Sequence, residues 1–499
     1  MKNSDYLLVN SSNEFLEEYT DLSENARYKL TNFSGSTGDA LLTKTGKIFL
    51  FVDGRYHAQA DLEVDKNNVE VIKLQVGELF VEKLFEYIKE GSTLAVVSKK
   101  ISQARLENFE KFAKIKNIKI NLLDEDPVLD YKMPEINDNG VCVDLGLSTS
   151  EKIRLVTDKL NPNDGIFTSN QEEISYMLNK RDFSKNYSSS VKRKKVIITK
   201  EGIFDENFRV NGNIYADKNT TNAFDYQKLN ALPLVSNPIK QMKSIKTYDE
   251  IEHLKYCFKR ADEALLKTKI FIECNDNISE YDIAQELEKN FYNTGAKSLS
   301  FKSIVAKDKN SALAHYSKCA KNEVLKDGSL VLIDCGAYYE GGLATDATRV
   351  FVKGSPSNLQ IEVYTKVLKA FLNAISYNVI DKTTGFDIDK IARDLLNKIK
   401  PLGFEFSHSL GHGIGISVHE NPPSLSPSEL GKTVLKPNMC FTIEPGLYNK
   451  NYFGIRLENS CYLDENLKIK SFSNMCFEKN LIDFGMLNDK EKEVLSQWI

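Results

Sequence analysis

The segment SHSLGHGIGISVHE, residues 407–420, holds three of the six histidines in the chain. These are His408, His412 and His419, and the glycines between them let the backbone approach a neighbouring group closely. A neutral imidazole can bind a metal ion, and an imidazole can also carry a proton near neutral pH. The segment therefore indicates a site for metal binding or proton transfer.

An internal repeat in the C-terminal half contains both histidines and acidic residues at related positions. The stretch EVLKDGSLVLIDCGAYY, from residue 323, resembles TVLKPNMCFTIEPGLYN, from residue 433, at an offset of 110 residues. This offset aligns Asp334 with Glu444, and His315 lies 104 residues before His419. Each half has the pattern helix, helix, strand, strand. Two such halves pack about a pseudo-twofold axis, and a site on that axis draws equivalent residues from both halves.

Four carboxylates and one imidazole in this region form a donor set for metals. The set suits two divalent ions of the manganese, cobalt, iron or zinc kind, which carboxylates bridge at a separation of about 3.5 to 4 Å. Two of the acids follow the apolar runs LVLI and CFTI, and a carboxylate that ends a buried strand needs a cation or a hydrogen-bond donor. A network of structural salt bridges is the alternative. The five residues are Asp334, Asp346, His412, Glu444 and Glu458.

A hairpin is expected to bring the first two acids together. Asp334 and Asp346 have the same parity, so a loop centred on Glu340 sets them opposite each other, with Cβ atoms about 5 Å apart. A two-residue turn at Gly341 and Gly342 would place them on opposite faces. We therefore expect an odd-length loop or a glycine bulge.

The same parity relates Glu444 and Glu458 about a loop centred on Asn451. A dinuclear site deprotonates a bridging water near neutral pH and polarises the carbonyl that the water attacks, which predicts hydrolysis. Glu444, in contact with both metal and water, is the candidate general base.

Further polar side chains are suited to assist this chemistry. His315 and His419 are suited to donate hydrogen bonds to the substrate carbonyl and to the tetrahedral oxyanion. Arg456 lies two residues before a predicted metal ligand and is suited to orient Asp334, with Tyr448 behind them.

Length and composition indicate a multidomain soluble protein. The chain has 499 residues, of which 41% are hydrophobic and 27% charged, and a net charge of -4 gives no electrostatic basis for binding nucleic acid. The sequence shows neither a signal peptide nor an apolar run long enough to span a membrane, so we expect no membrane contact and a cytoplasmic location. The eight cysteines show no CxxC spacing, which favours reduced thiols.

The fold class that we expect is α/β, or α+β, in three domains. Alternating strand and helix patterns predict an α/β domain over residues 1–146 and a smaller one over residues 147–236. The domain with the internal repeat covers residues 237–499.

Six motifs occur in the order typical of the pita-bread metallopeptidases: LIDCGAYY, TDATR, LGHGIG, VHENP, TIEPGLY and GIRLEN. The chain resembles the three-domain Xaa-Pro aminopeptidases (aminopeptidase P) of this family, M24B. FSGSTGDALLT and VDGRYHAQA are similar to their first domain, so the resemblance covers nearly the whole chain. It implies two creatinase-like domains followed by a pita-bread catalytic domain.

The resemblance also implies a function. The enzyme would remove the N-terminal residue from peptides with proline in second position, with two divalent ions, manganese first among the candidates, as a cytoplasmic homodimer. The five residues of the donor set would be the ligands, Glu444 the base, and His315, His408 and His419 substrate-binding or proton-transfer residues. Prolidase, which cleaves Xaa-Pro dipeptides, is the nearest alternative, and a non-catalytic pita-bread binding module is a second.

Two departures from the family pattern stand out. The interval from Asp334 to Asp346 is one residue longer than usual. In SYMLNKRDFSKN, residues 175–186, Asp182 takes the place of a glycine.

Overall fold

The computed structural model describes residues 4–75, 77–130, 139–398 and 403–499. These residues form two compact units. The first comprises Met1–Asn139, Ser148–Leu178 and Val191–Ile239, and the second comprises Gly140–Leu147, Asn179–Ser190 and Lys240–Ile499. The finer division at residues 146 and 236 stays a prediction.

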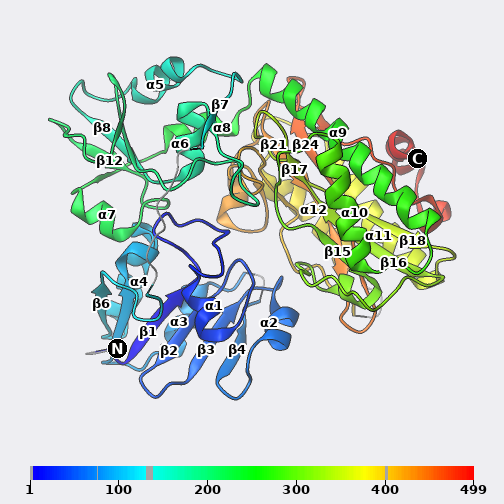
Figure 1. The fold of residues 1–499 in the computed structure, drawn as a ribbon, viewed down its shortest axis with the longest axis horizontal. Helices are drawn as coiled ribbons and strands as arrows, with labels where there is room; N and C mark the ends of the chain where they lie inside the picture. Colours follow the sequence, from blue (N-terminus) through cyan, green and yellow to red (C-terminus); the bar gives the residue numbers. More distant parts are fainter. Residues whose placement is uncertain (1–3, 76, 131–138, 399–402) are drawn as a thin grey trace. The chain divides into compact units, whose positions relative to one another are not determined.

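The first unit contains two sheets, which confirms the alternation of strands and helices expected in this part of the chain (Figure 1). The larger sheet has the order β4-β3-β2-β1-β5-β6, and it is mixed because β1 pairs antiparallel with β2 and parallel with β5. Its strands are β1 (Tyr6–Asn10), β2 (Asp39–Thr43), β3 (Ile48–Val52), β4 (Val69–Lys73), β5 (Thr93–Val97) and β6 (Lys119–Leu123). The second sheet has the order β11-β10-β8-β12-β13 and consists of β8 (Gly165–Thr168), β10 (Val196–Thr199), β11 (Gly202–Asp205), β12 (Ile214–Ala216) and β13 (Leu232–Pro233).

Seven α-helices of the described residues accompany these sheets. They are α1 (Ala26–Thr31), α2 (His57–Glu63), α3 (Phe80–Glu86), α4 (Gln103–Ile115), α5 (Thr149–Thr157), α6 (Gln171–Leu178) and α7 (Ala223–Lys228). Helix α8 (Pro238–Ser244) then leads from the first unit into the second.

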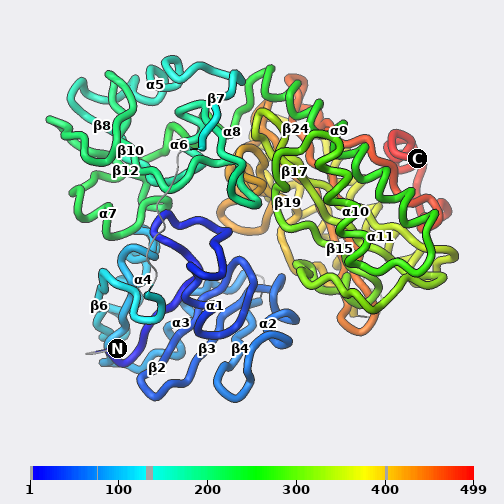
Figure 2. The backbone as a smooth tube through the Cα atoms, viewed as in Figure 1, coloured from blue at the N-terminus to red at the C-terminus, as the bar shows by residue number. Residues whose placement is uncertain are grey.

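The second unit is built on an antiparallel sheet of order β15-β16-β18-β24-β21, with β25 also paired to β24. The path of the chain through this unit, from green to the red C-terminus, can be followed in Figure 2. Its strands are β15 (Ile304–Lys307), β16 (Ser329–Cys335), β18 (Ala347–Lys353), β21 (Cys440–Ile443), β24 (Glu458–Leu463) and β25 (Ile469–Ser471). Shorter pairs join β14 (Ser298–Leu299) to β17 (Ala337–Tyr338), β19 (Gly411–His412) to β20 (Ser424–Leu425), and β22 (Gly446–Tyr448) to β23 (Gly454–Arg456).

Helices cover both faces of this sheet. Successive residues of a strand point to opposite faces, so Leu330 and Leu332 pack in one apolar cluster with α11 and α12, whereas Val331 and Ile333 pack in another with α9 and α10. A strand buried on both faces is apolar throughout, which is why SLVLI shows no polar alternation. The helices are α9 (Tyr248–Cys274), α10 (Glu280–Asn293), α11 (Asn358–Ile375), α12 (Gly385–Lys398) and, near the C-terminus, α13 (Asp489–Leu495).

The predicted repeat of helix, helix, strand, strand is confirmed. The first half contains α9, α10, β16 and β18, and the second contains α11, α12, β21 and β24. Thr348 and Glu458, which the offset of 110 makes equivalent, pair with each other between β18 and β24. Pairing of equivalent residues in antiparallel strands places the pseudo-twofold axis at this point.

A separate arm of the chain, Asn179–Ser190, belongs to the second unit. Its strand β9 (Lys180–Arg181) pairs with β7 (Val141–Cys142), and Arg181 Nε donates a 3.1 Å hydrogen bond to the carbonyl oxygen of Gly341. Ser189 Oγ lies 2.7 Å from the carbonyl oxygen of Gly342. Asp182 is buried and accepts hydrogen bonds from Ser184. The arm therefore covers the tip of the β17–β18 connection.

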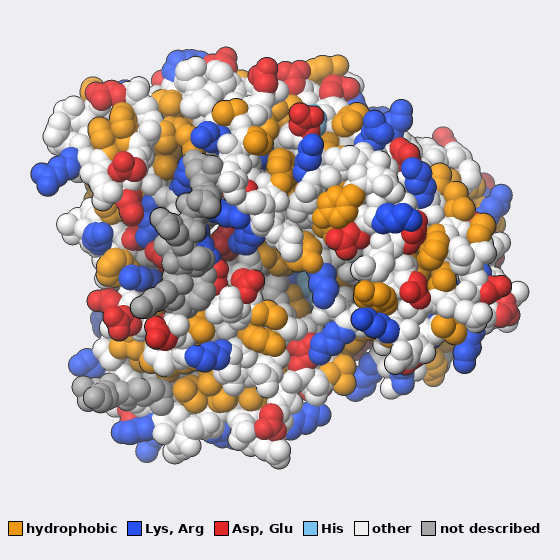
Figure 3. Space-filling view, viewed as in Figure 1, with side chains coloured by type: hydrophobic (Ala, Val, Ile, Leu, Met, Phe, Trp, Pro, Cys, Tyr) orange, Lys and Arg blue, Asp and Glu red, His pale blue; other side chains and the backbone are white. Residues whose placement is uncertain are grey.

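Acidic and basic side chains are interspersed on the face of the molecule in view (Figure 3). All eight cysteines lie in described segments and are free thiols. Within the described parts of the chain, no helix combines the length and apolar character that crossing a bilayer requires.

Candidate metal centre

The hairpin that carries Asp334 and Asp346 has an odd-length loop, as expected, but a different centre. Asp334 pairs with Thr348, and the bridge from Tyr338 to Ala344 continues this register, so residues 340–342 form a three-residue loop. The expectation that the two aspartates face each other directly is wrong. Asp346 lies on the same face one diagonal step away, where residues are about 7 to 8 Å apart and their Cβ atoms somewhat closer.

The physical reason is the glycine at the end of the loop. Gly342 has φ of +67°, in the left-handed region that glycine favours, and its N–H bonds to the carbonyl oxygen of Tyr339 at 2.8 Å. A turn closed by a left-handed residue is the usual three-residue hairpin loop. It shifts the centre of pairing from Glu340 to Gly341.

The second pair of acids has the predicted register. Ile443 pairs with Asn459 and Gly446 with Arg456, and both pairs are centred on Asn451. The same register places Glu444 opposite Glu458. The expectation of a hairpin centred on this residue is confirmed.

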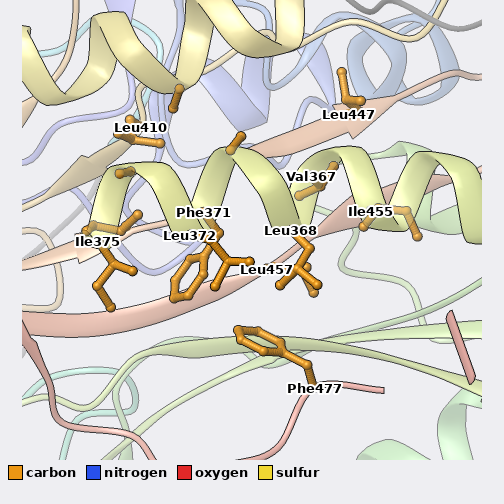
Figure 4. Close-up of a cluster of buried hydrophobic side chains, with 14 of the residues drawn as sticks. Val367, Leu368, Phe371, Leu372, Ile375, Leu410, Leu447, Ile455, Leu457 and Phe477 are labelled. Atoms are coloured by element: carbon orange, nitrogen blue, oxygen red, sulfur yellow. The ribbon is translucent and has the colours of Figure 1, made fainter. Parts of the chain in front are cut away.

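The apolar core orients the side chains of this hairpin. Leu447, Ile455 and Leu457 pack in the cluster around α11, together with Leu410 (Figure 4). Their neighbours along the strands point the opposite way because side chains alternate. The alternation directs Tyr448, Arg456 and Glu458 away from this cluster.

The carboxylates are buried close to one another. Asp334, Asp346 and Glu458 are 8%, 4% and 1% exposed. Burial, reinforced by Glu458, Asp334 and Glu444, raises the pKa of Asp346 well above its usual range. Burial and the charge of Asp334 likewise raise the pKa of Glu458 to about 8. Such a group of acids is stable in the charged form only with a compensating cation.

His412 presents a lone pair to two of these acids. Its Nδ1 lies 3.0 Å from the carbonyl oxygen of Gly413, which can only accept, so Nδ1 carries the proton. The Nε2 atom, left as an acceptor, lies 3.5 Å from Asp346 Oδ2 and 3.7 Å from Glu444 Oε1. Two carboxylate oxygens so close to an unprotonated ring nitrogen fit a metal ion bound by all three.

Two further observations support the same interpretation. Asp346, His412 and Glu458 each offer a ligand atom, and these atoms lie within 4.8 Å of one another. The Oδ1 atoms of Asp334 and Asp346 are buried and accept no hydrogen bond from the described residues. A buried carboxylate oxygen without a donor is costly unless a cation satisfies it. The residues present therefore fit a metal centre.

Arg456 connects one of the acids, Asp334, to the neighbouring hydroxyl groups of Tyr448 and Thr348. It donates from Nη2 to Asp334 Oδ2 at 2.5 Å, from Nη1 to the Tyr448 hydroxyl at 2.8 Å, and from Nε to Thr348 Oγ1 at 3.2 Å. Thr348 Oγ1 in turn donates to Glu458 Oε2 at 2.6 Å. Thr348 thus links Glu458 to Arg456, which in turn holds Asp334, and sequence reasoning missed it. The signal that could have found it is its alignment with Glu458 in the repeat.

His408 lies at the other side of Tyr448. Its Nε2 is 2.8 Å from the Tyr448 hydroxyl, and its Nδ1 is 2.8 Å from the carbonyl oxygen of Ser409 and 3.9 Å from Glu444 Oε2. Since the Tyr448 oxygen already accepts from Arg456, its proton is directed to His408. Burial, partly offset by Arg456, raises the pKa of Tyr448 to about 12, which keeps the hydroxyl protonated.

The other two histidines predicted to belong to the site have different surroundings. The ring of His419 packs edge-on against that of His412, with centroids 4.4 Å apart. His315 is half-buried in the segment after the 3-10 helix η2 (Asp308–Ala312). That segment is tied to β23 through Ser311, whose Oγ accepts from Gly454 N at 2.8 Å. The position of His315 relative to the metal ligands stays a prediction.

Comparison with known proteins identifies the family of this unit. Residues 252–465 match the model of metallopeptidase family M24. The chain contains an M24 metallopeptidase domain. The matched residues include α10, the strands β15, β16, β18, β21 and β24, and all five members of the donor set.

Several curated proteins are similar to the chain. Xaa-Pro aminopeptidase 1 of Dictyostelium discoideum is 26% identical over 561 aligned positions, which cover 98% of this chain and 88% of the relative. Xaa-Pro dipeptidase of Pyrococcus furiosus is 35% identical, but the alignment covers 46% of this chain and 64% of that protein. The similarity to the dipeptidase is therefore limited to about half of the chain.

Among solved structures, an X-prolyl aminopeptidase from Caenorhabditis elegans has the same fold. It superimposes with a TM-score of 0.87 at 22% identity, over 99% of this chain and 92% of the other. That protein is described as a cytosolic enzyme with a di-nuclear active site. The fold of the M24 unit is thus the expected pita-bread fold, preceded by α/β structure.

Proposed function

We propose that this protein is an Xaa-Pro aminopeptidase, a metal-dependent hydrolase that releases the N-terminal residue from peptides with proline in second position. The observation that carries the proposal is the extent of similarity. Aminopeptidases match the chain over its whole length, including both N-terminal sheets, whereas the Pyrococcus dipeptidase matches less than half of it. The M24 fold alone would not distinguish these activities.

The substrate explains why a dedicated enzyme is needed. The bond before proline is a tertiary amide without an N–H group. A peptidase that recognises its substrate through that N–H finds no donor there. Recognition must come from the carbonyl group and from the proline ring.

We assign the five residues of the donor set as ligands of two divalent ions, with manganese as the expected metal. Ions held there would lower the pKa of a bound water and polarise the scissile carbonyl. Glu444 accepts the proton of the attacking water. Its side chain is 17% exposed, compared with 12% for Asp334 and 6% for Asp346, so it is the most accessible of these three acids.

The histidines complete the assignment. His419, against the ring of His412, and His315 donate hydrogen bonds to the substrate carbonyl and to the oxyanion that forms from it. His408 exchanges a proton with the reacting groups beside Glu444. Arg456 and Tyr448 hold Asp334 and His408 in place.

The proposal extends to the cellular setting. We expect a cytoplasmic homodimer that acts on free peptides. The free thiols of all eight cysteines and the description of the Caenorhabditis relative as cytosolic support the location.

Cleavage of the tripeptide Arg-Pro-Pro beside the dipeptide Arg-Pro tests the function. Each peptide is incubated with chelated protein and with protein resupplied with manganese, and the products are identified by mass spectrometry. We expect metal-dependent release of arginine from the tripeptide, with the dipeptide largely intact. Preference for the dipeptide would instead indicate a prolidase, and no cleavage with any divalent metal would indicate a binding module.

A further inference from the structure

Helix α12 carries an ion pair beside the segment that contains His408. Asp389 is 1% exposed and accepts two hydrogen bonds from the guanidinium of Arg393, at 2.8 Å from Nε and 2.7 Å from Nη2. The Arg393 side chain is 15% exposed. A two-pronged contact of this kind has a fixed geometry that a single ammonium group cannot provide.

The pair also holds the main chain around His408. Arg393 Nη2 donates a 2.8 Å hydrogen bond to the carbonyl oxygen of His408, and Asp389 Oδ1 accepts one of 3.1 Å from the N–H of Leu410. These two bonds fix the peptide groups that follow His408. They therefore restrict the direction in which its side chain leaves the backbone.

An aromatic ring adds a third contact. The guanidinium carbon of Arg393 lies 4.4 Å from the ring centroid of Phe406. The same ring packs edge-on against the imidazole of His408, at 4.9 Å and 81°. Arg393 thus restrains His408 at two places. It donates a hydrogen bond to the His408 carbonyl oxygen, and it packs on the Phe406 ring that contacts the His408 imidazole.

The segment held in this way reaches the metal centre by two short links. His408 Nε2 lies 2.8 Å from the Tyr448 hydroxyl. The carbonyl oxygen of Leu410 accepts a 2.7 Å hydrogen bond from the N–H of Glu444. Residues 406–410 therefore fix the position of the His408 imidazole. They also fix the backbone of Glu444, the proposed base.

We propose that Arg393 and Asp389 are positioning residues, which hold His408 between Tyr448 and Glu444 and affect peptide hydrolysis through His408. This inference rests on the proposed function of the site. Neither residue contacts the metal ligands through its own side chain in the contacts described above. The ion pair acts as a fixed support on a helix of fourteen residues.

Helix α12 offers a matched control. Lys390 and Asp394 form an ion pair with the same spacing of four residues, at 2.8 Å, but their side chains are 60% and 51% exposed. Arg393→Met keeps an apolar stem against Phe406 and removes all donors. Lys390→Met removes one charge from the exposed pair on the same helix.

The activity test is a double-mutant cycle with His408→Ala, in manganese, on Arg-Pro-Pro. We expect Arg393→Met to lower kcat/KM about ten-fold or more, mainly through kcat, because displacing a reacting group by a fraction of an ångström is costly. Lys390→Met should stay within about two-fold of wild type. In the His408→Ala background, Arg393→Met should change kcat/KM by less than about two-fold. Metal content by mass spectrometry should be equal in all variants.

An equal loss in both backgrounds, or a loss that follows metal content, would overturn the inference. Wild-type kcat/KM in Arg393→Met would also overturn it. If Arg393→Met does not fold, the same kcat/KM comparison is made with Asp389→Asn, with and without His408→Ala. This substitution keeps the volume of the side chain and weakens its hydrogen bonds with Arg393.

A second measurement separates this inference from the proposed function. The six histidines give ¹³C signals in labelled protein, and His408 is assigned by its loss in His408→Ala. We expect Arg393→Met, but not Lys390→Met, to shift the His408 signal. An unshifted signal would contradict the positioning role even if the enzyme is active. A wild-type protein without peptidase activity would contradict the function, while the shift would still support the positioning role.

Discussion

Lys246 Nζ lies 2.6 Å from Glu420 Oε1, although both side chains are almost completely buried. A second ammonium group, that of Lys243, lies 3.0 Å from Glu420 Oε2, and the same oxygen accepts a 3.0 Å hydrogen bond from Ile416 N. Glu420 N also donates to the carbonyl oxygen of Gly413. Glu420 therefore closes, at both its main chain and its side chain, the loop between His412 and His419.

Glu420→Gln should destabilise the protein strongly. It leaves two buried ammonium groups without their carboxylate, a change that typically costs about 3 to 5 kcal/mol. The free energy of unfolding from denaturant titration measures the loss. Glu252→Gln, which breaks the exposed pair with Lys255, is the control and should cost less than about 1 kcal/mol. Equal effects of the two substitutions would contradict the prediction.

The contribution of Glu420 should depend on pH. Burial tends to raise its pKa, but Lys243 and Lys246 outweigh this and lower the pKa from 4.5 to about 2. A carboxyl group with a lowered pKa in the folded state stabilises the fold above its unfolded pKa, and this is lost as pH falls through the folded pKa. The stability difference between wild type and Glu420→Gln should therefore shrink between about pH 4.5 and 2. A stability difference that stays constant from pH 4.5 to 2 would contradict the lowered pKa of Glu420.

Thr348→Val should weaken metal binding. The substitution removes the hydroxyl that donates to Glu458 and accepts from Arg456 while keeping the branched shape of the side chain. Loss of such a supporting hydrogen bond typically lowers metal affinity about 10- to 100-fold. Competition with a chelator measures the affinity. Thr348→Ser retains the hydroxyl and should stay near wild type, and an unchanged affinity in Thr348→Val would disprove the role.

Metal removal should lower the thermal stability. Without a cation, the buried carboxylates and the Nε2 atom of His412 present acceptors to one another. Metal that binds the folded state should stabilise it by about 2.7 kcal/mol at one hundred times its Kd. Calorimetry with chelator and with added manganese tests this. In Asp346→Asn, most of the increase in melting temperature on adding manganese should be lost. A wild-type melting temperature that does not change with metal would refute the proposed centre.

Tyr316→Phe should loosen the segment that carries His315. Glu280 is fully buried and accepts four hydrogen bonds from this segment, and the hydroxyl of Tyr316 provides one of them, at 2.7 Å. The other donors are Lys307 N, Asn310 Nδ2 and Ala320 N. Loss of one bond typically costs about 1 kcal/mol. Hydrogen exchange of residues 307–320 should accelerate, while Tyr292→Phe, at a tyrosine with 47% exposure, should leave exchange there unchanged.

The two hairpins show what could be predicted from the sequence and what could not. Parity alone gave the correct register for Glu444 and Glu458, because the hairpin is symmetric about its centre. For Asp334 and Asp346, parity gave the correct face but the wrong partner. The left-handed conformation of Gly342 decides the centre of that loop, and two adjacent glycines leave this choice open.

The ion pairs of α12 show a second limit. Asp389 with Arg393 and Lys390 with Asp394 have the same spacing and are equally ordinary patterns for an exposed helix. Only tertiary packing makes one of them a buried support and leaves the other in solvent. The donor set was found because its residue types are chemically distinctive, whereas its supporting residues are recognised by their contacts.

The arm Asn179–Ser190 limits how the M24 domain can be separated from the N-terminal part of the chain by truncation. Arg181 and Ser189 hold the tip of the Asp334 hairpin, and Ser189 Oγ also lies 3.2 Å from the carbonyl oxygen of Ile416, in the loop between His412 and His419. A fragment cut at residue 240 would lose these contacts. The compact unit that contains the metal centre is discontinuous in sequence, so no single truncation produces all of it.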